Sequence, residues 1–319
     1  MRVAIIGGTG FVGSYLLDAL VEAGIRPVVL VRPGSESRLR HGDHCDLVSG
    51  SVADQTALTT LLAGADAVIY NVGILREQPA RGISFDELQR AAPIRVMQAA
   101  AEAGVKRFML MSANGVDADS TSYQSSKLAA EQHLVGSGLE ATVFRPSVIF
   151  GDPRGRDEFA SSLTRDIIAP PLPAPLFFAG LNAWDAGSFE LSPVHVADVA
   201  SAFTRSLNDP ETIGKTLTLG GPENLSWRTI LARLATVTGK RKLMLPAPAL
   251  GISAAAVLLD RFDFFPITRD QLSMLMQGNT CSDADLRSLG ITPKAFAEEH
   301  LGYLRSQNYG NNPCPKKAA

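Results

Sequence analysis

The sequence predicts a doubly wound α/β fold, in which helices cover both faces of a parallel sheet. Short apolar runs rich in β-branched residues alternate with helical stretches through the first half of the chain, and these runs are apolar at successive positions. A glycine-rich turn follows the first run directly. With 319 residues, 45% of them hydrophobic, the chain can bury the core of one large domain or of two interlocked ones.

The elements of this fold can be placed from the apolar pattern. Strands are expected at 3–6, 27–31, 46–48, 67–71, 107–111 and 141–144, with a late return to the sheet at 216–219. Helices are expected at 11–23, 55–62, 85–103 and 123–136. Ligands bind at the carboxyl edge of such a sheet, so residues that follow the strands are candidates for a site.

The amino-acid composition of the chain changes after Gly151. Residues 151–190 are rich in Pro, Gly, Phe and Arg, which favours extended, loop-like backbone. The expected division is a first domain at 1–150 with a return segment near 192–221, a smaller, mostly helical, substrate-facing C-terminal lobe at 151–191 and 222–310, and a disordered tail at 311–319.

Charge and cysteine content exclude several classes of protein. The formal net charge is −2 and no run of five basic residues occurs, so nucleic acid is not an expected partner. The three cysteines form no CxxC pair, which argues against a disulfide framework and makes the cytoplasm the expected compartment. The first apolar run is short and ends in glycine, unlike a signal peptide.

The most apolar later stretch, 243–259, does not predict a membrane span. Pro246, Pro248 and Gly251 interrupt it, and it is shorter than the ~20 residues that cross a bilayer. We expect a helix from about residue 249 and membrane contact that is at most peripheral.

Two other features receive plain structural interpretations. His41, His44 and Cys45 lie close in sequence, but no second cluster completes a four-ligand site, so no metal is expected. Trp184 and Trp227 belong to no motif, and both are expected to pack in the interior.

The glycine-rich turn has the spacing of a dinucleotide-binding motif. Residues 7–13 read GGTGFVG, which contains both GxGxxG and GxxGxxG, and no Walker A lysine follows. The glycines permit a tight turn, a close approach to a pyrophosphate and close packing of helix on strand, while the helix N-terminus presents N–H groups to the phosphates. The predicted cofactor-binding residues here are Gly7, Gly8, Thr9, Gly10, Phe11, Val12 and Gly13.

The residues after the second strand favour NADP(H) over NAD(H). An NAD site usually places Asp or Glu about 20 residues beyond the glycines. Here Arg32 ends the strand, with Ser35, Arg38 and Arg40 close behind. A guanidinium forms forked hydrogen bonds with a phosphate, so Arg32, Ser35 and Arg38 are predicted to bind the 2′-phosphate. The open alternative is a solvated arginine loop, with NAD(H) as the cofactor.

Three residues are candidates for catalysis. Tyr123 and Lys127 stand at i and i+4, so they share one face of a helix. A nearby ammonium stabilises a phenolate and would bring the tyrosine pKa toward neutrality, making Tyr123 a usable general acid or base. Ser112 ends the fifth strand, where its hydroxyl would hold a substrate carbonyl or alcohol; the alternative is a serine that caps the next turn.

Together these motifs resemble those of the short-chain dehydrogenase/reductase superfamily, which implies a Rossmann sheet. Residues 71–73 resemble the family's Asn-Ala-Gly motif beside the cofactor, 145–151 resemble the segment that passes the nicotinamide, and 192–200 resemble a signature of the extended, epimerase-like branch. The resemblance adds Asn71, Val72, Gly73, Lys127, Pro146, Ser147 and Val148 to the predicted cofactor site.

Shorter motifs at 111–115, 219–223 and 267–272 are similar to a bacterial group related to the NADPH-binding accessory subunit of respiratory complex I. The resemblance implies that such relatives hold the cofactor structurally, without turnover. Gln89 stands where many superfamily members carry an asparagine, which puts the usual proton-relay role of that position in doubt.

Two functions are therefore expected. The first is an NADP(H)-dependent oxidoreductase or epimerase-like enzyme that moves a hydride between the nicotinamide and a carbonyl or alcohol of a small-molecule substrate. The second is a non-catalytic NADPH-binding structural or sensor protein with a protein partner in a respiratory or quinone-related assembly. The expected location is the cytoplasm, and in the second case the periphery of the inner face of the membrane.

Overall fold

The computed structural model describes residues 1–116, 121–180, 182–248 and 269–306. The chain divides into two compact units, of which unit 1 comprises 1–147, 196–220 and 281–293, and unit 2 comprises 148–195, 221–280 and 294–319. The helix expected from residue 249 and the tail expected at 311–319 lie outside the described residues.

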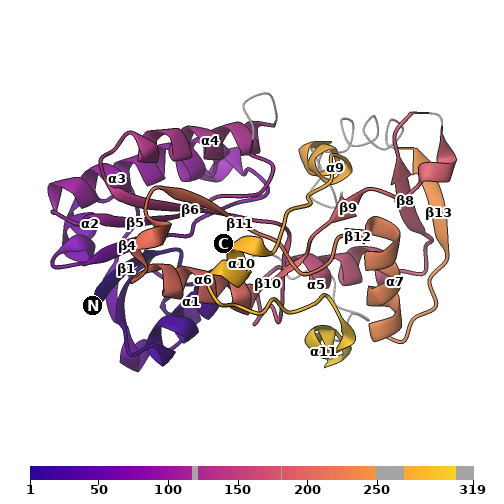
Figure 1. Ribbon diagram of the computed structural model, residues 1–319, viewed down its shortest axis with the longest axis horizontal. Coiled ribbons are helices and arrows are strands. Elements are labelled where there is room, and N and C mark those ends of the chain that lie inside the picture. Colours follow the sequence, from indigo (N-terminus) through magenta and orange to yellow (C-terminus); the bar gives the residue numbers. More distant parts are fainter. Residues whose placement is uncertain (117–120, 181, 249–268, 307–319) are drawn as a thin grey trace. The chain divides into compact units, whose positions relative to one another are not determined.

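A seven-stranded sheet forms the centre of unit 1, with the strand order β11-β6-β5-β4-β1-β2-β3 (Figure 1). Every neighbouring pair is parallel. The predicted doubly wound Rossmann fold is therefore confirmed. The strands are β1 (Arg2–Ile6), β2 (Arg26–Val31), β3 (Asp46–Ser49), β4 (Ala67–Tyr70), β5 (Arg107–Met111), β6 (Glu140–Pro146) and β11 (Lys215–Leu219).

Helices cover both faces of this sheet. Figure 1 shows α2, α3 and α4 on one face and α1 and α6 on the other. Between the sheet and the first group lies an apolar core that includes Tyr70, Val96 and Phe108, which are almost fully buried. The helices of unit 1 are α1 (Phe11–Glu22), α2 (Gln55–Leu62), α3 (Ala92–Glu102), α4 (Ser122–Val135), α6 (Val196–Ser206) and the short α10 (Ala284–Ser288), and a π-helical turn at Asp86–Ala91 precedes α3.

The order of the strands gives unit 1 a topological switch point. From β1 the chain continues to β2 and β3 on one side, and then crosses back to β4, β5 and β6 on the other. In such sheets ligands bind outside the carboxyl ends of the strands at this switch point. The glycine turn follows β1 and Asn71 follows β4, so both reach the switch point.

One boundary of the expected division needs correction. The C-terminal lobe is expected to include all of 222–310, but 281–293 belong to unit 1. The Asp285 carboxylate accepts a hydrogen bond from the backbone N–H of Thr218 in β11, at 2.7 Å, and Gly220 N–H donates to the Ser282 carbonyl. These contacts return the segment to the sheet.

Unit 2 contains short helices and three two-stranded sheets around its own core. Its centre is Trp227, on which Phe177 and Phe189 stack with ring centroids 5.9 and 5.7 Å away. The elements are β7 (Ile149–Phe150), β8 (Ala174–Phe178), β9 (Glu190–Leu191), β10 (Val194–His195), β12 (Leu225–Ser226), β13 (Met244–Pro248), α5 (Phe159–Leu163), α7 (Trp227–Val237), α9 (Arg269–Met276), α11 (Glu298–Leu301) and α12 (Tyr303–Ser306).

Two expectations for unit 2 are wrong. The segment 151–190 is not loop-like throughout: it includes α5, a π-helical turn at Thr164–Ile168 and β8, because Leu176 and Phe177 are drawn into the core. Trp227 is fully buried as expected, but Trp184 is 95% exposed. Among the described helices, none is both long and apolar enough to cross a membrane.

Candidate functional site

The glycine turn brings the ends of β1 and β4 into contact. Gly7 has φ +95°, a conformation that side chains rarely adopt, and a Cβ there would lie 2.5 Å from the Asn71 carbonyl oxygen. A Cβ on Gly13 would lie 2.1 Å from the Gly7 carbonyl oxygen. Glycine is therefore required at both positions by backbone shape and by close packing of the turn on α1 and β4.

The start of α1 suits a pyrophosphate. Its N-cap is Gly10, whose N–H donates to the Gly7 carbonyl at 3.1 Å and which offers no side chain to cap the helix. The first turn of α1 holds no acidic residue. The partial positive charge of the helix end is thus available to a phosphate that approaches over residues 10–13. The predicted residues Thr9, Phe11 and Val12 lie in this same stretch.

The predicted 2′-phosphate residues lie together beyond β2. Arg32 follows the strand directly and its side chain is exposed, while the Ser35 N–H donates to the Arg32 carbonyl at 3.0 Å. Arg38 closes the short helical turn Glu36–Arg38. Arg40 is engaged elsewhere, since its Nε lies 3.5 Å from the Asp18 carboxylate. Arg32 is therefore better placed than Arg40 to take a phosphate.

Helix α4 begins at a capping box that fixes the place of Tyr123. Thr121 is the N-cap: its hydroxyl accepts from the Gln124 N–H, and the Gln124 side chain accepts from the Thr121 N–H at 3.2 Å. The helix therefore starts one residue before Tyr123, and Lys127 follows one turn later. Lys127 Nζ lies 5.6 Å from the centre of the Tyr123 ring and donates to the Met111 carbonyl at 3.2 Å.

The same lysine approaches the segment that follows β4. A Cβ on Gly73 would lie 3.8 Å from Lys127 Nζ. Gly7 therefore packs against Asn71, and Gly73, two residues further along the chain, lies close to the Lys127 ammonium. The predicted phosphate turn and the predicted Tyr–Lys pair occupy one continuous edge of unit 1.

Burial shifts the pKa of both members of this pair. Desolvation raises the pKa of the Tyr123 phenol above its ordinary value, opposite to the lowering expected from a neighbouring ammonium. Desolvation lowers the pKa of Lys127 to about 8, against the raising effect of the Glu131 carboxylate. At neutral pH the phenol is thus a proton donor, and Lys127 is mostly charged.

Ser112 is held by a partly buried ion pair. Its hydroxyl donates a short hydrogen bond to the Glu131 carboxylate, which also accepts from the Arg145 guanidinium at 2.5 and 3.1 Å. Ser112 and Glu131 are both buried. The hydroxyl therefore faces this cluster rather than Tyr123. Ser112 still lines, with Val72, Gln89 and Lys127, one small pocket of unit 1.

Glu131 is the residue of this site that the sequence analysis missed. It stands one helical turn after Lys127, so Tyr123, Lys127 and Glu131 follow one another at i, i+4 and i+8 on one face of α4. That spacing predicts that Glu131 lies on the same face of the helix as the Tyr123–Lys127 pair. The partner of Glu131 comes from β6, whose Arg145 stands beside the predicted Pro146.

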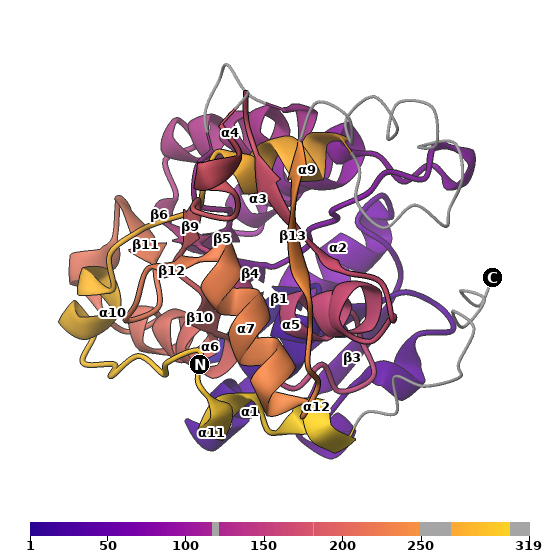
Figure 2. The same ribbon diagram turned by 90° about the vertical axis from the view of Figure 1, so that its right-hand side faces the viewer.

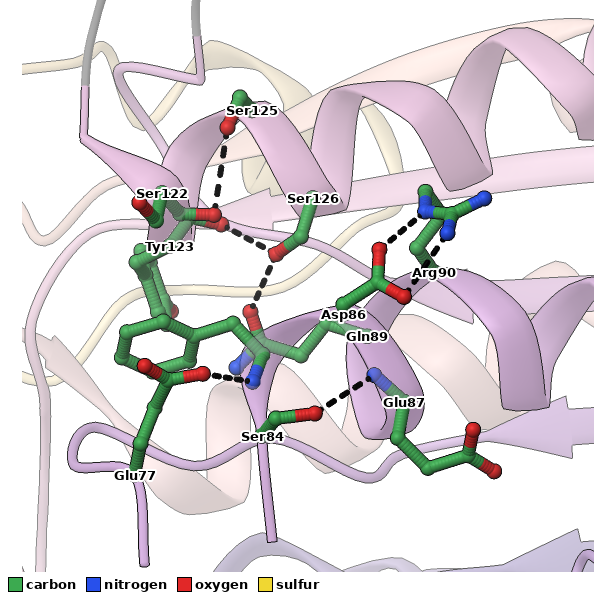
Figure 3. A network of polar contacts seen from close by, with 11 residues as sticks. Glu77, Ser84, Asp86, Glu87, Gln89, Arg90, Ser122, Tyr123, Ser125 and Ser126 are labelled. Carbon is green, nitrogen blue, oxygen red and sulfur yellow. Dashed lines mark hydrogen bonds and ion pairs between the residues drawn. The ribbon is translucent and has the colours of Figure 1, made fainter. Parts of the chain in front are cut away.

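The residue that caps the π-helical turn before α3 packs against the ring of Tyr123. Phe85 meets this ring edge-on, with centroids 5.7 Å apart, and the Phe85 N–H donates to the Glu77 carboxylate at 2.7 Å. The buried Gln89 amide donates to the Ile74 carbonyl at 2.7 Å. It also accepts from the Ser126 hydroxyl at 3.1 Å, a contact that Figure 3 shows. Gln89 therefore ties the segment after β4 to α4.

The end of β6 and the segment after it carry the last predicted cofactor residues. The Pro146 carbonyl accepts from the Asn114 N–H at 2.8 Å, and the Ser147 N–H donates to the Leu219 carbonyl at 3.0 Å, so both residues are fixed in unit 1. Val148 belongs to unit 2. Within the part of the chain that the structure describes, no group of three or more His, Cys, Asp or Glu is placed to hold a metal.

The ion pair gives a stability prediction. Replacing Glu131 with alanine would strip the half-buried Arg145 of its partner and Ser112 of its acceptor, so we expect the free energy of unfolding to fall by about 3 kcal/mol. Ser112→Ala removes one hydrogen bond and should cost only about 1 kcal/mol. Chemical denaturation measures both. Glu102→Ala, at an exposed position on α3, is the control; equal losses for Glu131 and Glu102 would contradict the interpretation.

Known proteins resemble this chain in sequence. A family model described as NAD(P)H-binding matches residues 7–166, about half of the chain. Alpha subcomplex subunit 9 of the mitochondrial NADH dehydrogenase (ubiquinone) 1 from Arabidopsis thaliana is 31% identical over 229 residues, which cover 69% of this chain and 53% of that protein. Ceramide reductase from Caulobacter vibrioides is 26% identical over 258 residues, 81% of this chain and 77% of that protein.

The fold is also found among solved structures. The UDP-glucose 4-epimerase of Thermus thermophilus, in complex with NAD, superposes with a TM-score of 0.71 at 19% identity, over 96% of this chain and 98% of that one. The match to the plant protein spans about half of its length. The resemblance to dehydrogenase/reductase proteins and to the complex I subunit, inferred from the motifs, is confirmed by these relatives. With its glycine turn at the switch point of a parallel sheet, this chain belongs to the NAD(P)H-binding family.

Proposed function

We propose that this protein is an NADPH-dependent reductase of a small carbonyl compound. The observation that supports the proposal is the continuous edge from the glycine turn to the Tyr123–Lys127 pair, along which the turn would bind phosphate and Tyr123 would donate a proton. A bound NADPH supplies the hydride. The chain supplies the binding, the orientation and the proton.

The residues divide these roles among them. The first turn of α1 would bind the pyrophosphate, and Lys127, whose Nζ would lie 3.8 Å from a Cβ on Gly73, would approach the nicotinamide ribose. The charged Lys127 would hold the ribose hydroxyls and stabilise negative charge as it forms on Tyr123. Because the pKa of Tyr123 is raised, its phenol remains protonated and donates to the carbonyl oxygen. A protonated phenol is the form that carbonyl reduction uses, whereas alcohol oxidation uses the phenolate.

The test is consumption of NADPH by the purified protein in the presence of aldehydes and ketones of graded size. We expect substrate-dependent loss of the NADPH absorbance, with NADH a poorer donor. Absence of turnover on every carbonyl, together with tight retention of the cofactor, would overturn the proposal.

That outcome would support a second candidate, an NADPH-binding structural or sensor protein. Three hydrogen bonds favour it: the Ser112 hydroxyl donates to Glu131, and the Gln89 amide binds both the Ile74 carbonyl and the Ser126 hydroxyl. The Ser112 proton is thus already donated within the protein, which argues against its donation to a substrate. The partner would be a respiratory or quinone-related assembly, as the relationship to the complex I subunit suggests, with the protein in the cytoplasm at the inner face of the membrane.

The preference for NADPH gives a separate prediction. Arg32→Gln should weaken NADPH binding by tenfold or more, since a charge-assisted hydrogen bond contributes about 1.5–3 kcal/mol, and should leave NADH binding unchanged. Calorimetric titration of both cofactors measures it. Arg40→Gln is the matched control, because its guanidinium lies against Asp18. Equal losses of NADPH and NADH affinity would argue against a 2′-phosphate contact.

A further inference from the structure

A hydrogen bond joins the segment after β2 to helix α1. We call residues 32–41, which include the predicted 2′-phosphate residues, the arginine loop. At the last residue of this loop, His41 Nε2 donates to the Asp18 carboxylate of α1 at 2.7 Å. The chain then continues to β3, and Figure 2 shows β3 and α1 in the indigo part of the ribbon. The arginine loop is therefore tied at its end to a helix that precedes it in the chain.

The backbone of His41 indicates that this contact holds the loop in a defined shape. His41 has φ +55° and ψ +39°, the left-handed conformation, which is uncommon for a residue with a side chain. Residues keep such a conformation when their surroundings favour it. The ring of His41 is bonded to Asp18, and its carbonyl accepts from the His44 N–H at 2.8 Å. Side chain and main chain are thus both fixed where the arginine loop ends.

The contact between His41 and Asp18 is less exposed than the arginines of the loop. The two side chains are 32 and 20% exposed, whereas Arg32 and Arg38 are exposed residues. Arg40 also approaches the Asp18 carboxylate, but its Nε lies 3.5 Å away and its side chain is 46% exposed. Ion pairs as exposed as this one contribute little. His41 is therefore the main partner through which Asp18 acts on the loop.

Helix α1 links the two parts of the predicted phosphate site. Its N-cap is Gly10, where the pyrophosphate would bind, and Asp18 lies about two turns further along the same helix. The helix presents its first turn to one phosphate group directly, and it reaches the arginine loop through the Asp18 side chain. Both predicted phosphate contacts are thus referred to one rigid element.

We propose that Asp18 is a positioning residue for the adenosine 2′-phosphate, which acts through His41 by holding the arginine loop against α1. The inference rests on the proposed preference for NADPH and deepens it. It does not depend on turnover of the cofactor. Because a carboxylate repels a phosphate, Asp18 can favour the 2′-phosphate only through the position of the loop.

The sign of the expected change separates positioning from simple charge. Removing a carboxylate near a phosphate site strengthens NADPH binding when charge alone acts. Loss of an anchor has the opposite effect, since the released loop must be ordered when the cofactor binds. NADH has no 2′-phosphate, so its affinity should not depend on the arginine loop.

Calorimetric titration of NADPH and NADH tests the proposal. Asp18→Ala should weaken NADPH binding about fivefold and leave NADH binding unchanged. His41→Asn should have the same effect, because asparagine tolerates the left-handed conformation but has a shorter side chain. The double variant should lose no more than either single one, since all three lack the same contact. Glu22→Ala, which removes an exposed carboxylate one turn further along α1, is the matched control and should bind both cofactors as the unaltered protein does.

Arg32→Gln, measured beside these variants, separates the inference from the preference on which it rests. If Arg32→Gln loses NADPH affinity selectively but folded Asp18→Ala does not, the positioning role is wrong and the preference stands. If neither variant changes the ratio of the two affinities, the 2′-phosphate site is wrong, and the role of Asp18 with it. Tighter NADPH binding by Asp18→Ala, or additive losses in the double variant, would also overturn the inference. Denaturation without cofactor identifies the folded variants, and His41→Asn provides the test if Asp18→Ala does not fold.

Discussion

Replacing Tyr123 with phenylalanine is expected to lower the rate of carbonyl reduction about a thousandfold, the usual effect of losing a positioned proton donor. The substitution removes only the phenol oxygen. The ring would keep its edge-on contact with Phe85 and its place beside Lys127, so NADPH affinity and stability should be unchanged. Steady-state kinetics and NADPH titration measure the two effects separately.

The pH profile adds a second readout to the same experiment. Burial lowers the pKa of Lys127 to about 8, so the ammonium is lost as the pH rises through this value. The wild-type rate of reduction should therefore decline above about pH 8. Tyr15→Phe, which removes a phenol oxygen from α1, is the matched control and should leave the rate nearly unchanged. Full turnover by Tyr123→Phe would remove the tyrosine from the mechanism.

The features of this site that the sequence predicted are set by residues that lie close together in the sequence. The glycine turn and the Tyr123–Lys127 pair each lie within seven consecutive residues, and the parallel sheet was predicted from apolar runs of three to five residues. Local pattern is sufficient for such features because backbone conformation and helical spacing are set locally.

The parts that the sequence did not predict depend on distant partners. The orientation of the Ser112 hydroxyl depends on Glu131, 19 residues away, and that of Glu131 depends on Arg145 in another strand. Trp184 and Trp227 are the same residue type and neither belongs to a motif, but only the Trp227 ring stacks with Phe177 and Phe189. The return of 281–293 to unit 1 likewise rests on a long-range contact, that of the Asp285 carboxylate with β11.

Gly13→Ala is expected to weaken NADPH binding about hundredfold, equivalent to about 2.7 kcal/mol. The added Cβ would lie 2.1 Å from the Gly7 carbonyl oxygen and 2.7 Å from Gly8 Cα. Both are backbone atoms and cannot rotate away, so the turn must separate from the start of α1. This movement displaces the N–H groups that would face the pyrophosphate. The free energy of unfolding should also fall, by about 2–4 kcal/mol.

Two other glycines serve as controls that test whether the effect comes from close packing. A Cβ on Gly10 would lie 3.3 Å from the Gly7 carbonyl oxygen, and one on Gly42 would meet nothing within 4 Å. The loss of stability should therefore decrease from Gly13→Ala through Gly10→Ala to Gly42→Ala, which should unfold as the unaltered protein does. Denaturation without cofactor measures packing alone, and titration of the folded variants measures binding. If folded Gly13→Ala bound NADPH with unchanged affinity, the turn could not be the pyrophosphate site, and the assignment of the whole crevice would fail with it.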